Sequence, residues 1–562
     1  MLASDPAQLQ SDYDVVIIGS GYGGAATAAR LGYANHRAGG KLRIAILERG
    51  VEHPTGSYPV TAGEFASLLK TPATPLGLFE FVLSPDFAVV QGSGLGGTSL
   101  CNGNVCIIPD REAFVYWPTA IRDEDPPLGR YYQRALAMLD AIPYAAGEEL
   151  AKSKVLHQMS RAVGGRFGIL NLAVSNESRV NRFGIPRRPC VNCNSCISGC
   201  NYEAKNTLDK NYLPFARQCG VEMFTRMDVD SLVKLPGGGW QLAVRYHGGK
   251  RGTEITWRTL NARRVVLAAG CLGTTGILLR SQTPSLRFSQ QLGQHFSGNG
   301  DFFALAYNLE EVANFNGWGV GTPEQFHVRG GPTITSFFKM NQDQPLNQRL
   351  TFEEASMPAP FVETFRNIAF AAAAGQPWVF LNTPAKFKRW LEDRYRNNTG
   401  AINSSLLFLG MGFDSADGVI KLTNGGNVTI DWPNAADDPV FKLLVPVTVQ
   451  AAEAVGGNQF PNPLLIFDLP FKTRPITGHP IGGCATADDV DHGVVSDTGR
   501  VFAADGGFHD GLYVVDGSVF PNAIGVNVLL TVTAFAERAA DHLRAELSLP
   551  LFDPAEEWSD RA

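Results

Sequence analysis

The sequence predicts an α/β fold of mixed α+β character. In it, a Rossmann-like nucleotide-binding domain of discontinuous segments carries an inserted substrate-binding domain built on a β-sheet plus helices. Two observations predict the first domain: a buried strand at 13–18 runs directly into a glycine cluster, and a second apolar strand at 42–47 ends in an acidic residue. A third observation predicts the insertion. The remaining strand and helix patterns of the nucleotide-binding domain lie near 265–269 and 512–547, so the segments between them are expected to form another domain.

The glycine cluster has the pattern expected of a turn between a strand and a helix whose backbone amides bind a phosphate. In G-x-G-x-x-G, Gly19 permits the tight turn, Gly21 permits close approach of a pyrophosphate, and Gly24 permits packing of the following helix. Glu48 ends the next strand, 24 residues after Gly24, where a carboxylate can accept both ribose hydroxyls. The pattern predicts a dinucleotide site without distinguishing NAD from FAD.

The other elements follow from periodicity and from turn residues. Residues 51–86 are rich in proline and aromatic residues and are expected to be irregular. Residues 221–268 alternate as short strands around a three-glycine turn, which predicts a β-meander, and 512–515 is a further strand. Between 306 and 470, no long helical period occurs before 440–455. Helices are expected at 130–141, 149–163, 203–217, 440–455 and 528–547.

The composition favours a large folded protein. Of the 562 residues, 44% are hydrophobic and 18% are charged, which is sufficient for a large core. The 48 basic and 54 acidic residues give a net charge of −6, whereas nucleic-acid-binding proteins carry a basic excess, so no nucleic-acid partner is expected. No apolar run reaches the roughly 18 residues of a transmembrane segment, and none is expected. The polar N-terminus lacks the regions of a signal peptide, which predicts a cytoplasmic protein.

Four motifs in chain order resemble the glucose–methanol–choline (GMC) flavin oxidoreductases. They are GLGGTSLCNG at 94–103, VVLAAGCLGT at 265–274, HPIGGC at 479–484, and DGSVFP at 516–521 followed by GVN at 525–527. The resemblance implies FAD as the cofactor. Some members bind FAD covalently through a histidine near the first motif; no histidine lies between 54 and 156, so non-covalent binding is expected.

The resemblance also implies a division into domains. The FAD-binding domain is expected to comprise 12–50, 87–116, 215–305 and 474–547, and the substrate-binding domain with its lid segments 51–86, 117–214 and 306–473. The residues expected to contact FAD are Gly19, Gly21, Tyr22, Gly23, Gly24, Glu48, Arg49, Gly96, Gly97, Thr98, Asn102, Gly103, Val105, Val229, Ala269, Gly270, Asp516, Gly517, Val528 and Leu529.

Within the family, the chain is most similar to the cholesterol oxidase branch, on the basis of GVN at 525–527, LDKNYL at 208–213 and EEASMP at 353–358. This resemblance implies that His479 and Asn527 face the reactive edge of the flavin and that Glu353 lines the substrate cavity. The sequence leaves open whether Glu353 or Glu354 faces the substrate, and a solvated pair is the alternative. Asn527 directly precedes an apolar helix and is therefore expected to be its N-cap.

The implied reaction is FAD-dependent oxidation of an alcohol to a carbonyl by hydride transfer to flavin N5. His479 would act as the base, since an imidazole titrates near neutral pH, and Asn527 would hydrogen-bond the same oxygen. The expected small-molecule substrate is a bulky, apolar or sterol-like alcohol, with molecular oxygen or a redox partner as electron acceptor. Two alternatives remain: a sugar, glycoside or other alcohol dehydrogenase, and an electron-transfer flavoprotein without alcohol chemistry. The oligomeric state is not predicted.

Four of the nine cysteines form one cluster, Cys190, Cys193, Cys196 and Cys200. The spacing C-x2-C-x2-C-x3-C matches the ferredoxin-type run that binds an iron–sulfur cluster, although Asn201 replaces the usual proline. Structural zinc and metal-free thiols are the alternatives. An iron–sulfur cluster would pass electrons from reduced FAD to a protein or quinone, and would favour the dehydrogenase.

Overall fold

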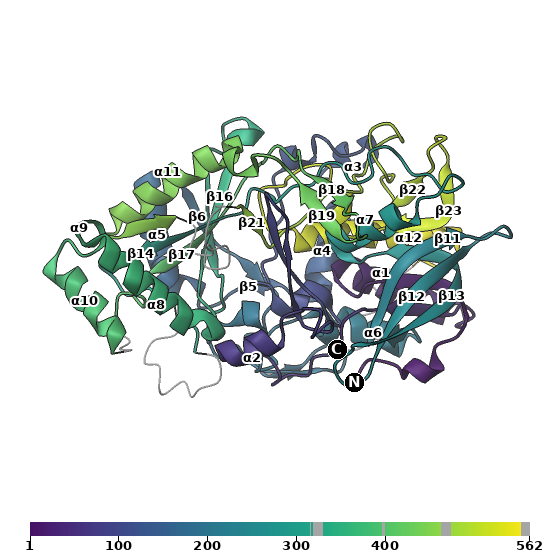
Figure 1. The fold of residues 1–562 in the computed structure, drawn as a ribbon, viewed down its shortest axis with the longest axis horizontal. Helices are drawn as coiled ribbons and strands as arrows, with labels where there is room; N and C mark the ends of the chain where they lie inside the picture. The colour runs from purple at the N-terminus through teal and green to yellow at the C-terminus, as the bar shows by residue number, and fades with distance from the viewer. Residues whose placement is uncertain (315, 319–329, 396–399, 462–473, 552–562) are drawn as a thin grey trace.

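An eight-stranded sheet forms the centre of one half of the molecule, on the right in Figure 1. The structure is a computed structural model, and it describes residues 1–314, 316–318, 330–395, 400–461 and 474–551. The strands of this sheet are β1 (Asp12–Ile18), β2 (Ile44–Leu47), β10 (Glu222–Phe224), β11 (Met227–Lys234), β12 (Trp240–Gly248), β13 (Glu254–Leu267), β22 (Arg500–Phe502) and β23 (Phe508–Val514).

The middle of this sheet is parallel, and its strands come from distant parts of the chain. β10, β2, β1, β13 and β23 pair in parallel, with Val16 opposite Val265 in one pair and Val265 opposite Leu512 in the next. All four residues of β2 are buried, as expected for a parallel strand that is covered on both faces. β11 and β12 extend β13 in antiparallel fashion and form the predicted meander.

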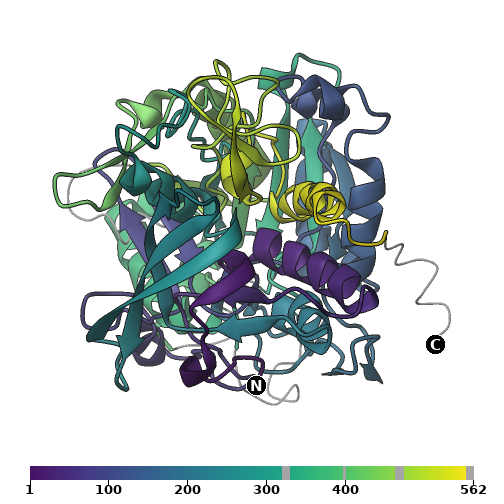
Figure 2. The same cartoon turned by 90° about the vertical axis from the view of Figure 1, so that its right-hand side faces the viewer.

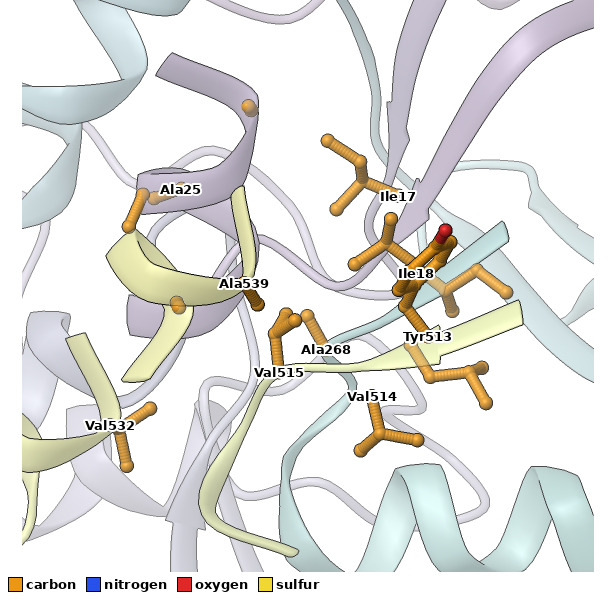
Figure 3. Close-up of a cluster of buried hydrophobic side chains, with 14 of the residues drawn as sticks. Ile17, Ile18, Ala25, Ala268, Tyr513, Val514, Val515, Val532 and Ala539 are labelled. Carbon is orange, nitrogen blue, oxygen red and sulfur yellow. The ribbon is translucent and has the colours of Figure 1, made fainter. Parts of the chain in front are cut away.

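Two long helices cover one face of this sheet. α1 (Tyr22–Arg37) and α12 (Leu529–Glu546) pack against each other, as the purple and yellow helices in Figure 2 show. Figure 3 shows the apolar interior that they help to form, with Ile17 of β1, Ala25 of α1 and Ala539 of α12 among the labelled side chains. The side chain of Ile17 is fully buried, and burial of an isoleucine contributes about 1.5–3 kcal/mol.

A second sheet, on the left in Figure 1, has six strands, all of them antiparallel. Its spatial order is β20 (Asn458–Pro461), β14 (Phe302–Tyr307), β17 (Leu406–Met411), β16 (Leu350–Ala355), β15 (Ser336–Met340) and β6 (Arg166–Ile169). α5 (Ala151–Val163) and α11 (Pro439–Ala454) share a core with Phe352 and Phe408 on one face. α8 (Ala359–Gly375) shares a core with Ala355 and Leu409, which therefore belong to the other face.

A three-stranded sheet, β21-β4-β3, lies between the two halves in Figure 1. The further strands are β3 (Phe79–Leu83), β4 (Ala88–Gly92), β5 (Ile142–Pro143), β7 (Asn171–Leu172), β8 (Arg179–Val180), β9 (Pro186–Arg187), β18 (Val419–Leu422), β19 (Val428–Asp431) and β21 (Ile476–Thr477). The further helices are α2 (Ala62–Ser67), α3 (Thr119–Arg122), α4 (Gly129–Leu139), α6 (Tyr212–Gln218), α7 (Gly270–Ser281), α9 (Pro377–Phe380) and α10 (Pro384–Arg394).

The fold class is as predicted, and α4, α5, α11 and α12 confirm four of the five predicted helices. The fifth helix, expected at 203–217, begins later than predicted. The observed helix, α6, starts at Tyr212, because the side chain of Asn211 accepts a hydrogen bond from the amide of Tyr212 and caps the helix there. The segment 51–86 is not irregular throughout, since it contains α2 and β3. α8 and α10 were not predicted.

The predicted substrate-binding segment 306–473 includes 315, 319–329, 396–399 and 462–473, which lie outside the described residues. The division into domains stays a prediction. Within the described ranges, no helix is both long and apolar enough to cross a membrane.

Candidate active site

A cavity of about 600 Å³ extends from the glycine-rich turn after β1 to His479 and Asn527. It lies beyond the carboxyl ends of β1 and β2, the usual place for a ligand in a parallel sheet of this kind. Of the residues predicted to contact FAD, all line this cavity except Gly24 and Gly96.

The glycines of the turn differ in what surrounds them. A Cβ at Gly19 would overlap the carbonyl oxygen of Ala268, and one at Gly23 would overlap that of Val515. A Cβ at Gly24 would overlap the carbonyl oxygen of Gly19, so three of the four positions are closed by packing. At Gly21, in contrast, no described atom lies within 4 Å of an ideal Cβ. The open space therefore lies at the start of α1, where backbone amides and the helix dipole favour a phosphate.

Glu48 is held at the end of β2, as predicted for a group that contacts a ribose. Its side chain accepts hydrogen bonds from Ser20 N (3.1 Å), Ser20 Oγ (2.6 Å) and Gly50 N (2.8 Å). These bonds fix the turn and the carboxylate together on the cavity wall. The neighbouring Arg49 forms an ion pair with Glu80; burial alone would raise the pKa of Glu80, but Arg49 and Lys70 lower it to about 2.

Three predicted catalytic residues, from three distant parts of the chain, are in contact. The Asn527 Nδ2 atom donates to Glu353 Oε2 at 3.2 Å and lies 3.4 Å from His479 Nε2. His479 and Asn527 line the cavity, whereas Glu353 contacts Asn527 without being part of the lining. Asn527 Oδ1 and Glu353 Oε1 are buried without a hydrogen-bond partner among the described residues, and Asn527, which lines the cavity, can offer its oxygen to a ligand.

Strand geometry decides between the two adjacent glutamates. Successive side chains of β16 point to opposite faces, so Glu353 shares the face of Ala355 and lies next to Asn527. Glu354 points to the opposite face and forms a buried ion pair of 3.0 Å with Lys152 of α5. Both glutamates are fully buried, so the alternative of a solvated pair is wrong. Burial raises the pKa of Glu353 to about 8, despite the opposing effects of Asn527 and His479.

The prediction that Asn527 caps the last helix is wrong. The N-cap of α12 is Val528, and no side chain caps it. The helix begins one residue later than the sequence pattern suggests, which leaves the amide of Asn527 available to Glu353 and His479.

A buried carboxylate that the sequence did not indicate contacts His479. Asp301, whose side chain is 1% exposed, lies 2.9 Å (Oδ1) and 3.1 Å (Oδ2) from His479 Nδ1. Burial lowers the pKa of His479, but the charge and hydrogen bond of Asp301 outweigh it, and the pKa is raised. With a proton on Nδ1 donated to Asp301, Nε2 of the neutral ring is an acceptor for Asn527. The available signal was an acidic residue after the glycine-rich stretch 298–300, directly before a strand.

The cysteine cluster shows no metal-ligating geometry. Cys190, Cys193, Cys196 and Cys200 are free, and in the described ranges no three or more His, Cys, Asp or Glu side chains form a group that could hold a metal. This geometry gives no support to the iron–sulfur or zinc interpretation. Burial raises the pKa of Cys190 to about 12, which favours the thiol.

The cysteine segment instead joins the two halves of the molecule. The Cys196 amide donates to Thr333 Oγ1 at 2.9 Å, just before β15. Lys205 donates from Nζ to Cys196 O (3.0 Å) and to Asn102 O (2.9 Å), and Asn102 lines the cavity. The segment therefore supports the cavity wall through its backbone.

Comparison with known proteins identifies the family. A family model described as GMC oxidoreductase matches residues 13–297, and a second model with the same description matches 471–536. The chain belongs to the GMC oxidoreductase family. GMC oxidoreductases are FAD-binding enzymes, and the open space at Gly21 together with the cavity beyond it fits such a cofactor.

Several members of the family align with nearly the whole chain. A cholesterol oxidase of Acinetobacter baumannii is 26% identical over 96% of this GMC oxidoreductase and 95% of the relative. A long-chain-alcohol oxidase of Arabidopsis thaliana is 22% identical over 93% of this chain and 66% of the relative. A fungal aryl-alcohol oxidase has the same fold, with a TM-score of 0.59 at 16% identity over 96% of this chain and 100% of that one. The family, the cholesterol oxidase and the long-chain-alcohol oxidase support FAD-dependent alcohol oxidation in general.

The buried Glu353 predicts a pH-dependent effect of Glu353→Gln on stability. Its pKa of about 8 exceeds its ordinary value of 4.5, so the folded state retains a proton that the unfolded chain releases between these values. The resulting stabilisation is complete below pH 4.5 and is lost as the pH rises to about 8. Glutamine cannot ionise, so the Tm of the variant relative to wild type should rise by about 1 °C per pH unit across this window.

Thermal unfolding at pH 5 and pH 8 measures this difference. Glu453→Gln, at an exposed position on α11, is the control and should shift the Tm equally at both values. A Glu353→Gln shift that does not depend on pH would mean that Glu353 is ionised throughout.

Proposed function

We propose that this GMC oxidoreductase oxidises a bulky, apolar, sterol-like alcohol to the carbonyl compound, with FAD bound non-covalently, His479 as base and molecular oxygen as the electron acceptor. The observation that carries the proposal is the contact of His479 Nε2 with Asn527 Nδ2 at 3.4 Å on the wall of the cavity that starts at the glycine-rich turn. The alternative of a flavoprotein without alcohol chemistry gives no reason for this pair.

The residues that would hold FAD are those of the cavity wall. Gly21 and the first amides of α1 would bind the pyrophosphate, and Glu48 would bind a ribose. Gly517 and Val528 line the end of the cavity at which His479 lies and would contact the flavin. Bound there, FAD supplies the two-electron acceptor for the alcohol carbon.

Oxidation also requires a base for the hydroxyl proton, and His479 is placed for this role. In the neutral ring that donates Nδ1–H to Asp301, Nε2 carries no proton and can accept that of the alcohol. The adjacent carboxylate of Asp301 stabilises the imidazolium that results. The Asn527 amide, which Glu353 orients, would hydrogen-bond the substrate oxygen and fix the orientation of its carbon.

The alignment with cholesterol oxidase and the surroundings of Glu353 support a large apolar alcohol. Glu353 shares its face of the second sheet with Ala355, and with Leu409, which lies opposite it on β17. Both residues belong to one apolar core. Glu353 therefore approaches Asn527 from an apolar core, and an apolar substrate would leave fewer polar groups unpaired beside it than a sugar would. The sugar dehydrogenase alternative depended on a metal cluster, and no observation now favours it.

A substrate screen tests the proposal directly. Sterols, long-chain primary alcohols and sugars would each be added to the FAD-loaded protein without oxygen, and bleaching of the flavin absorbance would be followed. We expect bleaching by a sterol or another bulky apolar alcohol and peroxide release when oxygen is admitted. Bleaching by sugars alone would overturn the substrate class, re-oxidation only by a dye or protein acceptor would overturn the oxidase, and no bleaching by any alcohol would overturn the function.

A further inference from the structure

One short loop, Ser297–Gly298–Asn299–Gly300–Asp301, contacts both segments that carry the catalytic pair. We name it the 297–301 loop; it directly precedes β14. His479 and Asn527 are 48 positions apart in the chain, and their side chains lie on separate loops. A hydrogen bond of 3.4 Å between two loop residues is easily lost unless something fixes both loops.

The first contact of the 297–301 loop is made by Asn299 on the Asn527 side. Its Oδ1 accepts hydrogen bonds from the amides of Ile524 and Gly525, both at 3.0 Å, and its Nδ2 donates to Val526 O at 2.9 Å. Asn299 is fully buried. Three bonds from one side chain thus fix the three backbone units that precede Asn527.

The second contact is made by Asp301 on the His479 side. Besides the imidazole, its carboxylate accepts from Thr477 Oγ1 at 2.7 Å and from the amide of Gly478 at 3.0 Å. Thr477 Oγ1 in turn accepts from the amide of His479 at 2.7 Å. Asp301 therefore fixes both the ring and the backbone of the histidine segment.

The 297–301 loop is itself fixed from the second sheet. Asp414, which follows β17, accepts hydrogen bonds at Oδ2 from the amides of Gly298 (3.0 Å) and Gly300 (2.9 Å). Asn299 lies between these two glycines in a left-handed conformation, with φ 57°. These bonds hold the loop in a conformation in which Asn299 and Asp301 reach different segments.

From these contacts we infer that Asn299 and Asp301 are positioning residues, which together set the separation of His479 and Asn527 for the reaction. The inference rests on the proposed function for its kinetic consequence. It predicts that loosening either contact lowers kcat and leaves FAD bound, because a misplacement of about 1 Å in a catalytic pair can lower the rate about 100-fold.

Asn299→Gly is the decisive variant. Glycine keeps the left-handed backbone without strain and removes only the three side-chain bonds. We expect kcat to fall by about 10–100-fold, with KM, FAD affinity and the pH profile close to wild type. Asn341→Gly is the matched control, because Asn341 has φ 58° in an exposed turn after β15 and should leave kcat unchanged.

Asp301→Asn tests the second contact. The ionisable groups that face His479 are Asp301 and Glu353. Removing the charge of Asp301 should lower the pKa of His479 and so move the rising limb of the kcat–pH profile to lower pH. It should also lower kcat by about 100-fold or more, because an amide no longer imposes the required tautomer on the imidazole. Asn299→Gly should leave that limb in place, which separates the geometric contribution from the electrostatic one.

A readout independent of turnover separates this inference from the proposed function. In ¹⁵N-histidine NMR, with His479→Ala to assign the signal, Asp301→Asn should lower the pKa of His479, and Asn299→Gly should shift its Nε2 resonance alone. Unshifted His479 resonances and a wild-type kcat in Asn299→Gly would overturn the inference. A parallel loss of kcat, FAD and Tm would do so too, because it would indicate a general structural role. If no alcohol reduces the wild-type flavin, the function is wrong, and the NMR result still decides the role of the loop.

Discussion

Replacing His479 with alanine is expected to lower kcat on an alcohol substrate by about 10²–10⁴-fold while the protein retains its FAD. The loss follows from the geometry of the site. Among the described residues, the carboxylates whose charges act on His479 are Glu353, which is bonded to Asn527, and Asp301, which lies on the Nδ1 side of the ring. Neither is placed to replace Nε2 as the acceptor of the hydroxyl proton. The FAD contacts expected of the glycine-rich turn and Glu48 do not involve His479, so the absorbance of bound FAD should be unchanged.

Two further variants make this result specific. His479→Gln retains a polar side chain of similar reach, so that Asp301 is not left without a donor; it should be folded and nearly as inactive. His492→Ala is the matched control, because His492 also pairs with an aspartate, Asp489 at 2.6 Å, but has a side chain that is 78% exposed on a loop. This control should have wild-type turnover. Turnover close to wild type in both His479 variants would show that the base lies elsewhere.

The sequence predicts those parts of the site whose contacts join residues close together in the chain, and it misses contacts between residues far apart. The glycine-rich turn and Glu48 are local features of one strand–turn–helix unit, and the structure places them together on the cavity wall. Asp301 was missed because its contact with His479 spans 178 residues and no local pattern records it. The same is true of Asn299, whose bonds reach 225 residues or more along the chain.

The errors in secondary structure have similarly physical causes. α8 was missed because its alanines occupy exposed positions as well as buried ones, so that no clear apolar stripe marks the helix. α10 carries a local signal in Thr383, which caps the helix ahead of Pro384. The ambiguity between Glu353 and Glu354 could not be resolved without β16, because the face of each side chain depends on the strand and its register.

Gly21→Val is expected to weaken FAD binding, with a rise in Kd of about 100-fold or more, without unfolding the protein. Gly21 has φ −68° and ψ −168°, an extended conformation that valine adopts readily, and no described atom lies within 4 Å of the new Cβ. The new Cβ therefore meets no part of the packed protein. The branched side chain instead occupies the space at the start of α1 where the pyrophosphate would meet the backbone amides.

Titration of the apoprotein with FAD, followed by flavin fluorescence, measures this loss, and the far-UV circular dichroism and Tm report on the fold. Gly63→Val is the matched control: in α2, a Cβ at Gly63 also meets no described atom within 4 Å, but the position lies outside the cavity lining, so FAD affinity should be unchanged. Gly23→Val should behave differently from both variants. Its Cβ would overlap Val515 O, so we expect its Tm to fall even without FAD. If Gly21→Val bound FAD as tightly as wild type, the cofactor would have to lie away from this turn, and the orientation of the flavin toward His479 would have to be reconsidered.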